Sequence, residues 1–194
     1  MSKVLLFSVL FLIFIGYLHF NKQDVSFTKS TDGKYHLVRN VHDKKNSAEL
    51  LSNIKNRLDN LCNFLIKKYK NNKNLQKPVH RLKNKFNADN IQESSPDSQY
   101  TSYSVNKGEE LHFCLRSKDE HQKLHQINTL MFVAIHELAH IMSITIGHNK
   151  EFMKNFKFLL KNAVEIGIYK NIDYTKHNVD FCGMKITNTP LKNH

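Results

Sequence analysis

The amino-acid sequence predicts an α+β fold in a single domain that follows an N-terminal hydrophobic helix. Its 194 residues suit one domain with an appendage. Apolar residues recur at helical intervals in three segments, and two short strand-like runs flank a turn. Hydrophobic residues make up 40% and charged residues 24%, which excludes a disordered chain, a collagen and a coiled-coil rod.

The N-terminal run from Val4 to Phe20 contains no formal charge and follows Lys3. As a helix it spans about 25 Å, slightly less than the ~30 Å hydrocarbon core of a bilayer. Because no small-residue cleavage site follows, residues 1–20 are predicted as an uncleaved transmembrane or signal-anchor segment rather than a signal peptide. We therefore expect a single-pass membrane protein, and its orientation stays open because positive charges flank both ends.

Residues 21–45 are polar and predict a linker, either a tether or a short hairpin. The folded domain is expected to occupy residues 46–194. Asn46 followed by Glu49 has the spacing of a helix N-cap with its reciprocal acidic partner. The scaffold helix that follows shows apolar residues at helical intervals: Leu50, Leu51, Ile54, Leu58, Leu61, Leu65 and Tyr69.

A β-hairpin is predicted in the middle of the domain. The runs Gln99–Val105 and Glu110–Arg116 are separated by a turn centred on Lys107-Gly108. Three cysteines, Cys62, Cys114 and Cys182, allow at most one disulfide.

The chain is strongly basic, since 29 Lys and Arg residues against 17 Asp and Glu residues give a net charge of +12. Such a balance is typical of proteins that meet nucleic acid, an anionic membrane face or an acidic partner, although a compositional bias toward lysine explains it equally well. Basic residues are densest from Lys67 to Lys85. We interpret this segment as a solvated helix end and loop rather than a nucleic-acid groove, because few aromatic residues are interleaved.

A second helix, expected to begin near the N-cap Asn128 and to run from Leu130 to Ile146, is apolar on most faces and must be buried. It contains the motif H-E-x-x-H, with histidines at i and i+4 on one face. His136 and His140 can therefore bind one metal ion, while Glu137 lies beside them as a general base. A purely structural cluster is the alternative, but it would bury a carboxylate and two imidazoles with no structural gain.

Residues Gly147-His148-Asn149-Lys150-Glu151-Phe152 follow the motif. With this element the segment from Tyr100 to Leu160 resembles the WLM and SprT-like zincin metallopeptidases, which take the histidine of a G-H-x-x-x-F element as third zinc ligand. The resemblance implies a zincin fold, a Zn²⁺ cofactor and peptidase chemistry. The spacing from His140 to His148 is shorter than is usual for SprT-like domains, and no zinc ribbon follows.

Three residues compete for the place of the third ligand: His148, Glu165 and Glu151. In an unbroken helix His148 would lie about 12 Å beyond His140, so the helix must stop early. The Ser-Ile-Thr-Ile stretch before Gly147 forms helix weakly, and Gly147 can adopt the positive φ that turns the chain back. The sequence therefore favours His148. A third helix is expected from about Lys150.

The function expected from these residues is that of a membrane-anchored zinc metallopeptidase. Zinc activates a water, Glu137 removes its proton, and the substrate pairs with an edge strand, for which Glu110–Arg116 is the candidate. The candidates for the residue that stabilises the oxyanion are Tyr169, Tyr174 and His177. The alternative is a non-catalytic basic membrane protein that binds nucleic acid or a protein partner and has a structural metal site, although no cysteine lies near the motif.

Overall fold

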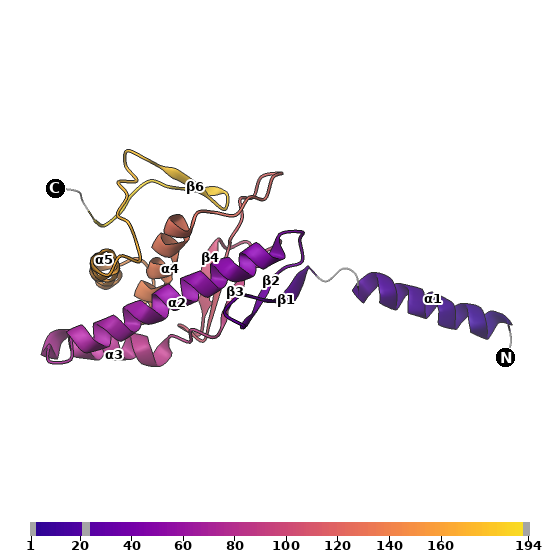
Figure 1. Ribbon diagram of the computed structural model, residues 1–194, viewed down its shortest axis with the longest axis horizontal. Helices are drawn as coiled ribbons and strands as arrows, with labels where there is room; N and C mark the ends of the chain where they lie inside the picture. The colour runs from indigo at the N-terminus through magenta and orange to yellow at the C-terminus, as the bar shows by residue number, and fades with distance from the viewer. Residues whose placement is uncertain (1–2, 21–23, 192–194) are drawn as a thin grey trace.

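The computed structural model describes residues 3–20 and 24–191, and Figure 1 shows helix α1 projecting from a domain that the other elements form. Two helices cover the strands: α2 packs on β1, β2 and β3, and α4 packs on β4 and β5, while α5 packs on α4. The elements are α1 (Lys3–Phe20), β1 (Val25–Lys29), β2 (Tyr35–Arg39), α2 (Lys44–Lys68), α3 (Lys73–Lys85), β3 (Ile91–Glu93), β4 (Ser102–Val105), β5 (Glu110–Phe113), α4 (Ile127–Met142), α5 (Lys150–Glu165), β6 (Val179–Phe181) and β7 (Met184–Ile186).

The predicted membrane anchor is wrong. The apolar run forms helix α1, but it has only 18 residues and begins with Lys3. Among the residues that the structure describes, no helix has both the length and the apolarity needed to cross a membrane.

Residues 25–39, within the segment expected to be a tether or short hairpin, form the β1–β2 hairpin. Val38 of this hairpin is fully buried in the core beneath α2. The predicted N-cap is wrong, because α2 begins at Lys44 and Asn46 lies within its first turn. Glu49 instead accepts hydrogen bonds from the backbone N–H (2.6 Å) and hydroxyl (2.7 Å) of Thr31, and so joins the hairpin to the helix.

The hairpin predicted around Lys107-Gly108 is confirmed, and it joins β4 to β5. A three-stranded sheet has the order β3-β5-β4, with β5 parallel to β3 and antiparallel to β4. Strand β5 is therefore central, and the prediction that Glu110–Arg116 is the edge is wrong. Strand β4 is at the end of this strand order and packs on α4, so the open edge beside α4 belongs to β4.

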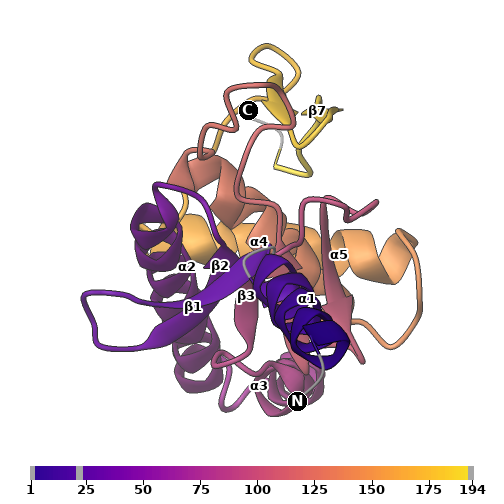
Figure 2. The same cartoon turned by 90° about the vertical axis from the view of Figure 1, so that its right-hand side faces the viewer.

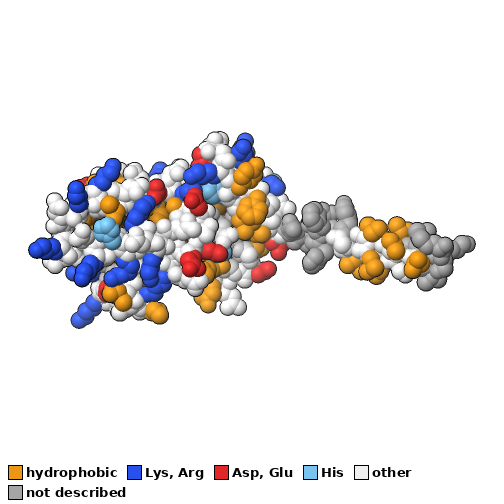
Figure 3. Space-filling view, turned by 90° about the horizontal axis from the view of Figure 1, so that it is seen from below, with side chains coloured by type: hydrophobic (Ala, Val, Ile, Leu, Met, Phe, Trp, Pro, Cys, Tyr) orange, Lys and Arg blue, Asp and Glu red, His pale blue; other side chains and the backbone are white. Residues whose placement is uncertain are grey.

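The basic segment Lys67–Lys85 is mostly helical, because α3 occupies residues 73–85 and buries Val79 and Leu82. Lys68 pairs with Glu165, and Lys83 donates to Asp59 at 2.8 Å. Figure 3 shows Lys and Arg side chains spread over the end of the domain remote from α1. Part of the basic charge therefore holds helices together.

A buried arginine holds the sheet against the start of α2. Arg116, just beyond β5, is 2% exposed and donates to Glu93 at 3.0 Å and to the Ser47 hydroxyl at 2.6 Å. It also contacts Asp43 at 2.7 Å. The guanidinium group therefore has two carboxylate partners, one from β3 and one at the start of α2.

The C-terminal hairpin β6–β7 lies at the end of the domain opposite α3 (Figures 1 and 2). Its two-residue turn is Cys182-Gly183, with φ of 49° and 85°, as a type I′ turn requires. A disulfide joins Cys182 to Cys114, which directly follows β5. The backbone N–H of Cys182 also donates to Nε2 of His125 at 3.3 Å. The tip of the hairpin is thereby fixed to the sheet.

Replacing Cys114 and Cys182 together with serine should lower the free energy of unfolding by about 4 kcal/mol, because the bridge closes a loop with a sequence separation of 68. Denaturant unfolding without reductant measures the difference. The wild type with reductant should match the double variant. Equal stability of the oxidised and reduced wild type would show that the bridge contributes nothing.

Candidate active site

Helix α4 carries the H-E-x-x-H motif through the centre of the domain. Its side chains from Leu130 to Met142 are mostly buried. The predicted N-cap Asn128 is wrong, because α4 starts at Ile127 without a side-chain cap. The Asn128 side chain instead donates to the carbonyl of Lys170 at 2.9 Å and accepts its N–H at 2.8 Å, which attaches the segment after α5 to the start of α4.

Helix α4 ends at Met142, before the Ile146 that the apolar pattern indicated. Ser143 has extended backbone angles (φ −83°, ψ 143°), and its hydroxyl donates to the carbonyl of Ala139 at 2.7 Å. A serine that bonds to its own helix backbone competes with further helical hydrogen bonds. The early stop that His148 requires is therefore present.

Two basic side chains from other elements bind the carbonyls at this helix end. Arg81 of α3 donates to the carbonyl of Met142 at 2.8 Å. Lys107, in the β4–β5 turn, donates to the carbonyls of Ser143 (3.3 Å) and Ile144 (2.6 Å). Carbonyls at a helix C-terminus lack intrahelical partners, and cations are favoured there. Both residues thus stabilise the point at which the chain leaves α4.

The loop after α4 is held by Glu151, in the first turn of α5. Its carboxylate accepts the backbone N–H groups of Ile144 and Thr145, both at 3.0 Å, and the Thr145 hydroxyl at 2.6 Å. These hydrogen bonds lower the pKa of Glu151 to about 2. Gly147 has φ of +84°, the left-handed conformation that reverses the chain and brings His148 back toward α4.

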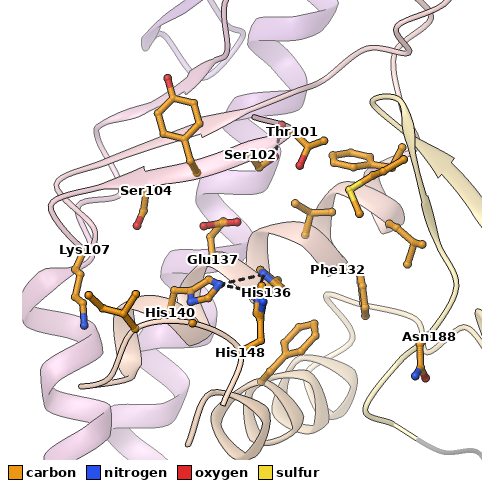
Figure 4. A pocket seen from close by; sticks show the side chains of 18 of the residues that line it. Thr101, Ser102, Ser104, Lys107, Phe132, His136, Glu137, His140, His148 and Asn188 are labelled. Carbon is orange, nitrogen blue, oxygen red and sulfur yellow. Dashed lines mark hydrogen bonds between the residues drawn. The ribbon is translucent and has the colours of Figure 1, made fainter. Parts of the chain in front are cut away.

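The three predicted histidines meet at one point (Figure 4). Nε2 of His136 lies 3.1 Å from Nε2 of His140 and 3.0 Å from Nε2 of His148, and the third separation is 3.1 Å. Phe152 lies against all three rings, with centroid distances of 4.3 to 4.8 Å. Its side chain is buried, so the phenylalanine of the G-H-x-x-x-F element fixes the orientation of the imidazoles.

The triad fits a tetrahedral metal ion. Zinc–nitrogen bonds of about 2.0–2.1 Å place two histidine ligands about 3.3 Å apart, close to the separations found. Burial, followed by the neighbouring histidines, lowers the pKa of His136 to about 3, and burial lowers the pKa of His140 to about 4. Both rings are therefore neutral at pH 7, the form that binds metal.

Glu137 lies beside the triad and lines the same cleft, which has a volume of about 950 Å³. Burial raises the pKa of its carboxyl group to about 7; a bound cation would oppose this shift. The cleft runs between β4, α4, the loop after α4 and the β6–β7 hairpin. Figure 4 shows the carboxylate between the histidines and the strand that carries Ser102 and Ser104.

The family of the chain follows from the comparison of its sequence with known families. The profile of the WLM domain matches residues 31–191, which include the whole site. The chain belongs to the WLM family. Over nearly its whole length it is similar to "Uncharacterized protein R325" of Acanthamoeba polyphaga mimivirus, with 33% identity over 198 residues that cover 99% of this chain and 100% of the relative.

Shorter similarities to this WLM domain occur in two other viral proteins. "Uncharacterized protein 042R" of Invertebrate iridescent virus 3 is 44% identical over 71 residues, which are 35% of this chain and 42% of the relative. "Uncharacterized protein 136R" of Invertebrate iridescent virus 6 is 33% identical over 69 residues, which are 35% of this chain and 38% of the relative. The matches thus span less than half of these two relatives.

Among solved structures, the crystal structure of Wss1 from Saccharomyces cerevisiae is similar, with a TM-score of 0.45 and 22% identity over 66% of this chain and 86% of that chain.

The other residues considered as third ligand have different partners in this WLM domain. Glu165 pairs with Lys68, and Glu151 holds the loop after α4. The candidates for the oxyanion-stabilising residue also lie outside the cleft. Tyr169 and Tyr174 are buried, and their ring centroids lie 6.1 and 4.8 Å from that of Phe132. His177 is exposed, and none of these three lines the cleft.

Sequence reasoning missed the two walls of the cleft. One wall is β4 with its turn, including Ser102, Ser104 and Lys107, and the other is the β6–β7 hairpin. The hairpin of β4 was recognised, but its relation to α4 is a long-range contact. The residues of β6 and β7 gave only a weak strand signal.

Glu151→Ala should weaken zinc binding by about tenfold, because residues that orient a ligand contribute tenfold to a hundredfold to metal affinity. Glu165→Ala, which removes the other acidic residue considered as a ligand, should leave zinc affinity unchanged. Competition against a chelator of known affinity measures both variants. A zinc affinity in Glu151→Ala equal to that of the wild type would show that the loop keeps His148 in place without the carboxylate.

Proposed function

We propose that this chain is a zinc-dependent peptidase whose metal is held by His136, His140 and His148. The observation that carries the proposal is the meeting of three imidazole nitrogens within 3.1 Å beside a buried carboxylate in an open cleft. Catalytic zinc sites have three protein ligands and keep a fourth position for water or substrate. Membership of the WLM family, related to zincin metallopeptidases, supports the same chemistry.

The metal, Glu137 and Phe152 have different roles in the proposed hydrolysis. A bound zinc ion supplies a Lewis acid that polarises the scissile carbonyl and makes water more acidic. The Glu137 carboxylate accepts a proton from the attacking water and passes it to the nitrogen of the leaving amine. Phe152 keeps the three imidazoles in one orientation through its ring contacts.

Strand β4 offers an edge to which an extended substrate can bind. The Cys114 N–H donates to the carbonyl of Thr101 at 2.9 Å, so this opposed pair is hydrogen-bonded. Bonded and non-bonded pairs alternate in an antiparallel ladder. The N–H and C=O groups of Ser102 and Ser104 therefore point away from β5, toward the open edge. A peptide that pairs there lies beside Glu137 and the triad.

The non-catalytic alternative, a structural metal site in a basic binding protein, is less well supported by the cleft. Structural zinc sites are closed by four protein ligands. Within the described residues, the triad is the one group of three or more His, Cys, Asp or Glu that could hold a metal. It opens onto about 950 Å³ of space. Binding of nucleic acid or a protein partner stays a prediction.

Glu137→Gln in the full-length chain should abolish peptide hydrolysis and retain one zinc per chain, because the residue is the base and not a ligand. His148→Ala should lose both zinc and activity. Metal analysis and cleavage of an unfolded protein substrate measure the two effects. Activity in metal-replete Glu137→Gln would refute the mechanism, and normal zinc affinity in His148→Ala would refute the ligand set.

Ser104→Pro should preserve folding and zinc content but lower kcat/KM for extended peptides by about tenfold or more, because proline removes an N–H that points to the open edge. Ser104→Ala keeps the backbone N–H and is the matched control, with activity near that of the wild type. Equal activities of the two variants would show that substrate does not pair with β4.

A further inference from the structure

Most polar side chains of the cleft lie on one side and most large apolar ones on the other, although Ile146 lines the first side and Lys185, Thr187 and Asn188 line the second. Strand β4, its turn and the loop after α4 contribute Ser102, Ser104, Lys107 and Thr145 to the polar half. Beyond the triad, six apolar side chains from α4, α5 and the C-terminal hairpin line the cleft: Phe132, Val133, Phe156, Phe181, Met184 and Ile186. Figure 4 shows Phe132 on the side of the triad away from Lys107.

The floor of the apolar half is rigid. Phe132 and Phe156 are nearly buried, their ring centroids lie 5.2 Å apart, and the Phe156 ring lies 5.2 Å from that of His136. Tyr174 packs behind Phe132 at 4.8 Å. This floor is continuous with the metal ligands, so an apolar group placed on it would be adjacent to the reacting atoms.

The wall of the apolar half is the β6–β7 hairpin, which is fixed at its tip. The Cys114–Cys182 disulfide attaches the turn, and the ring of Phe181 packs on His125 with centroids 4.9 Å apart. Met184, the first residue after the turn, is nonetheless 50% exposed. An unbranched, flexible side chain on a fixed strand can adapt to apolar groups of different shape.

The charges of the cleft favour an apolar occupant over a basic one. Among the described lining residues, Glu137 is the sole acidic side chain, and it is committed to the reaction. A basic substrate side chain would find no partner in the apolar half, and its burial there would be costly. Lys107 lies on the polar side, and Lys185 of β7, whose ammonium group lies 3.8 Å from the Asp180 carboxylate, adds a positive charge that disfavours a basic occupant further.

We propose that the apolar half of the cleft is a specificity subsite for a large apolar side chain, such as Leu, Met or Phe, next to the scissile bond, and that Met184 determines this preference. The proposal rests on the peptidase function proposed above. It predicts a substrate class of exposed hydrophobic segments, such as those of unfolded polypeptides, since folded proteins bury such side chains.

The test is the cleavage of a peptide library by the full-length, zinc-loaded chain. Substrates with Leu, Met or Phe at one fixed position beside the scissile bond should exceed those with Ser, Lys or Glu there by about tenfold or more in kcat/KM. Met184→Glu should shift the preference at that position toward Lys, and Met184→Lys should shift it toward Glu. Phe27→Glu changes an exposed apolar residue on β1, outside the cleft, and should leave the preference unchanged.

Two outcomes separate this inference from the proposed function. Cleavage with no positional preference, or with a preference that both Met184 substitutions leave unchanged, would overturn the subsite and leave the peptidase intact. Absence of any cleavage by the zinc-loaded wild type would overturn the peptidase. In that case the affinity of the Glu137→Gln variant for labelled peptides still tests the subsite. Peptides with Leu, Met or Phe at the fixed position should bind more tightly than those with Ser, Lys or Glu. Adding Met184→Glu to this variant should lower its affinity for the apolar peptides about tenfold.

Discussion

The arrangement of the site depends on the termination of helix α4 directly after Met142. His148 follows His140 by eight residues, yet their Nε2 atoms lie 3.1 Å apart, a separation that no continuous helix allows. Ending a helix leaves carbonyls without partners, and here Arg81 and Lys107 supply donors to them. The stop is therefore stabilised by α3 and by the β4–β5 turn, and the histidine triad depends on contacts between these elements.

Burial of the site shifts the pKa values of its imidazole and carboxyl groups. An imidazole or a carboxylate withdrawn from water loses hydration, and this loss lowers the pKa of His136 and raises that of Glu137. A positive ion bound between the histidines would offset the cost for the carboxylate. Burial of these polar groups does not by itself stabilise the fold. The proposed metal site accounts for a polar face on an otherwise apolar helix.

Much of this site could be predicted from local sequence, because helical spacing fixes where His136, Glu137 and His140 point, and Gly147 marks the reversal that returns His148. Local patterns also identified the β4–β5 hairpin. They fail where a long-range contact decides. Local spacing predicts that Glu49 belongs to an N-cap, but Glu49 binds Thr31 of the β1–β2 hairpin. It also predicts β5 as an edge strand, although β3 pairs with β5. The apolar run at α1 predicts a span, but no helix of the described residues has both the length and the apolarity that a span requires.

The C-terminal hairpin shows how a segment with little structure of its own becomes a wall of the cleft. Strands of three residues are too short to be stable alone. Phe181 and Ile186 are buried in the hydrophobic core, and the disulfide and the contact of Phe181 with His125 attach the hairpin to the segment between β5 and α4. On the opposite wall β4 pairs with β5, so both walls are connected to β5. Both walls of the cleft are thus attached to the chain at β5, while Met184 on the hairpin stays half-exposed in the cleft.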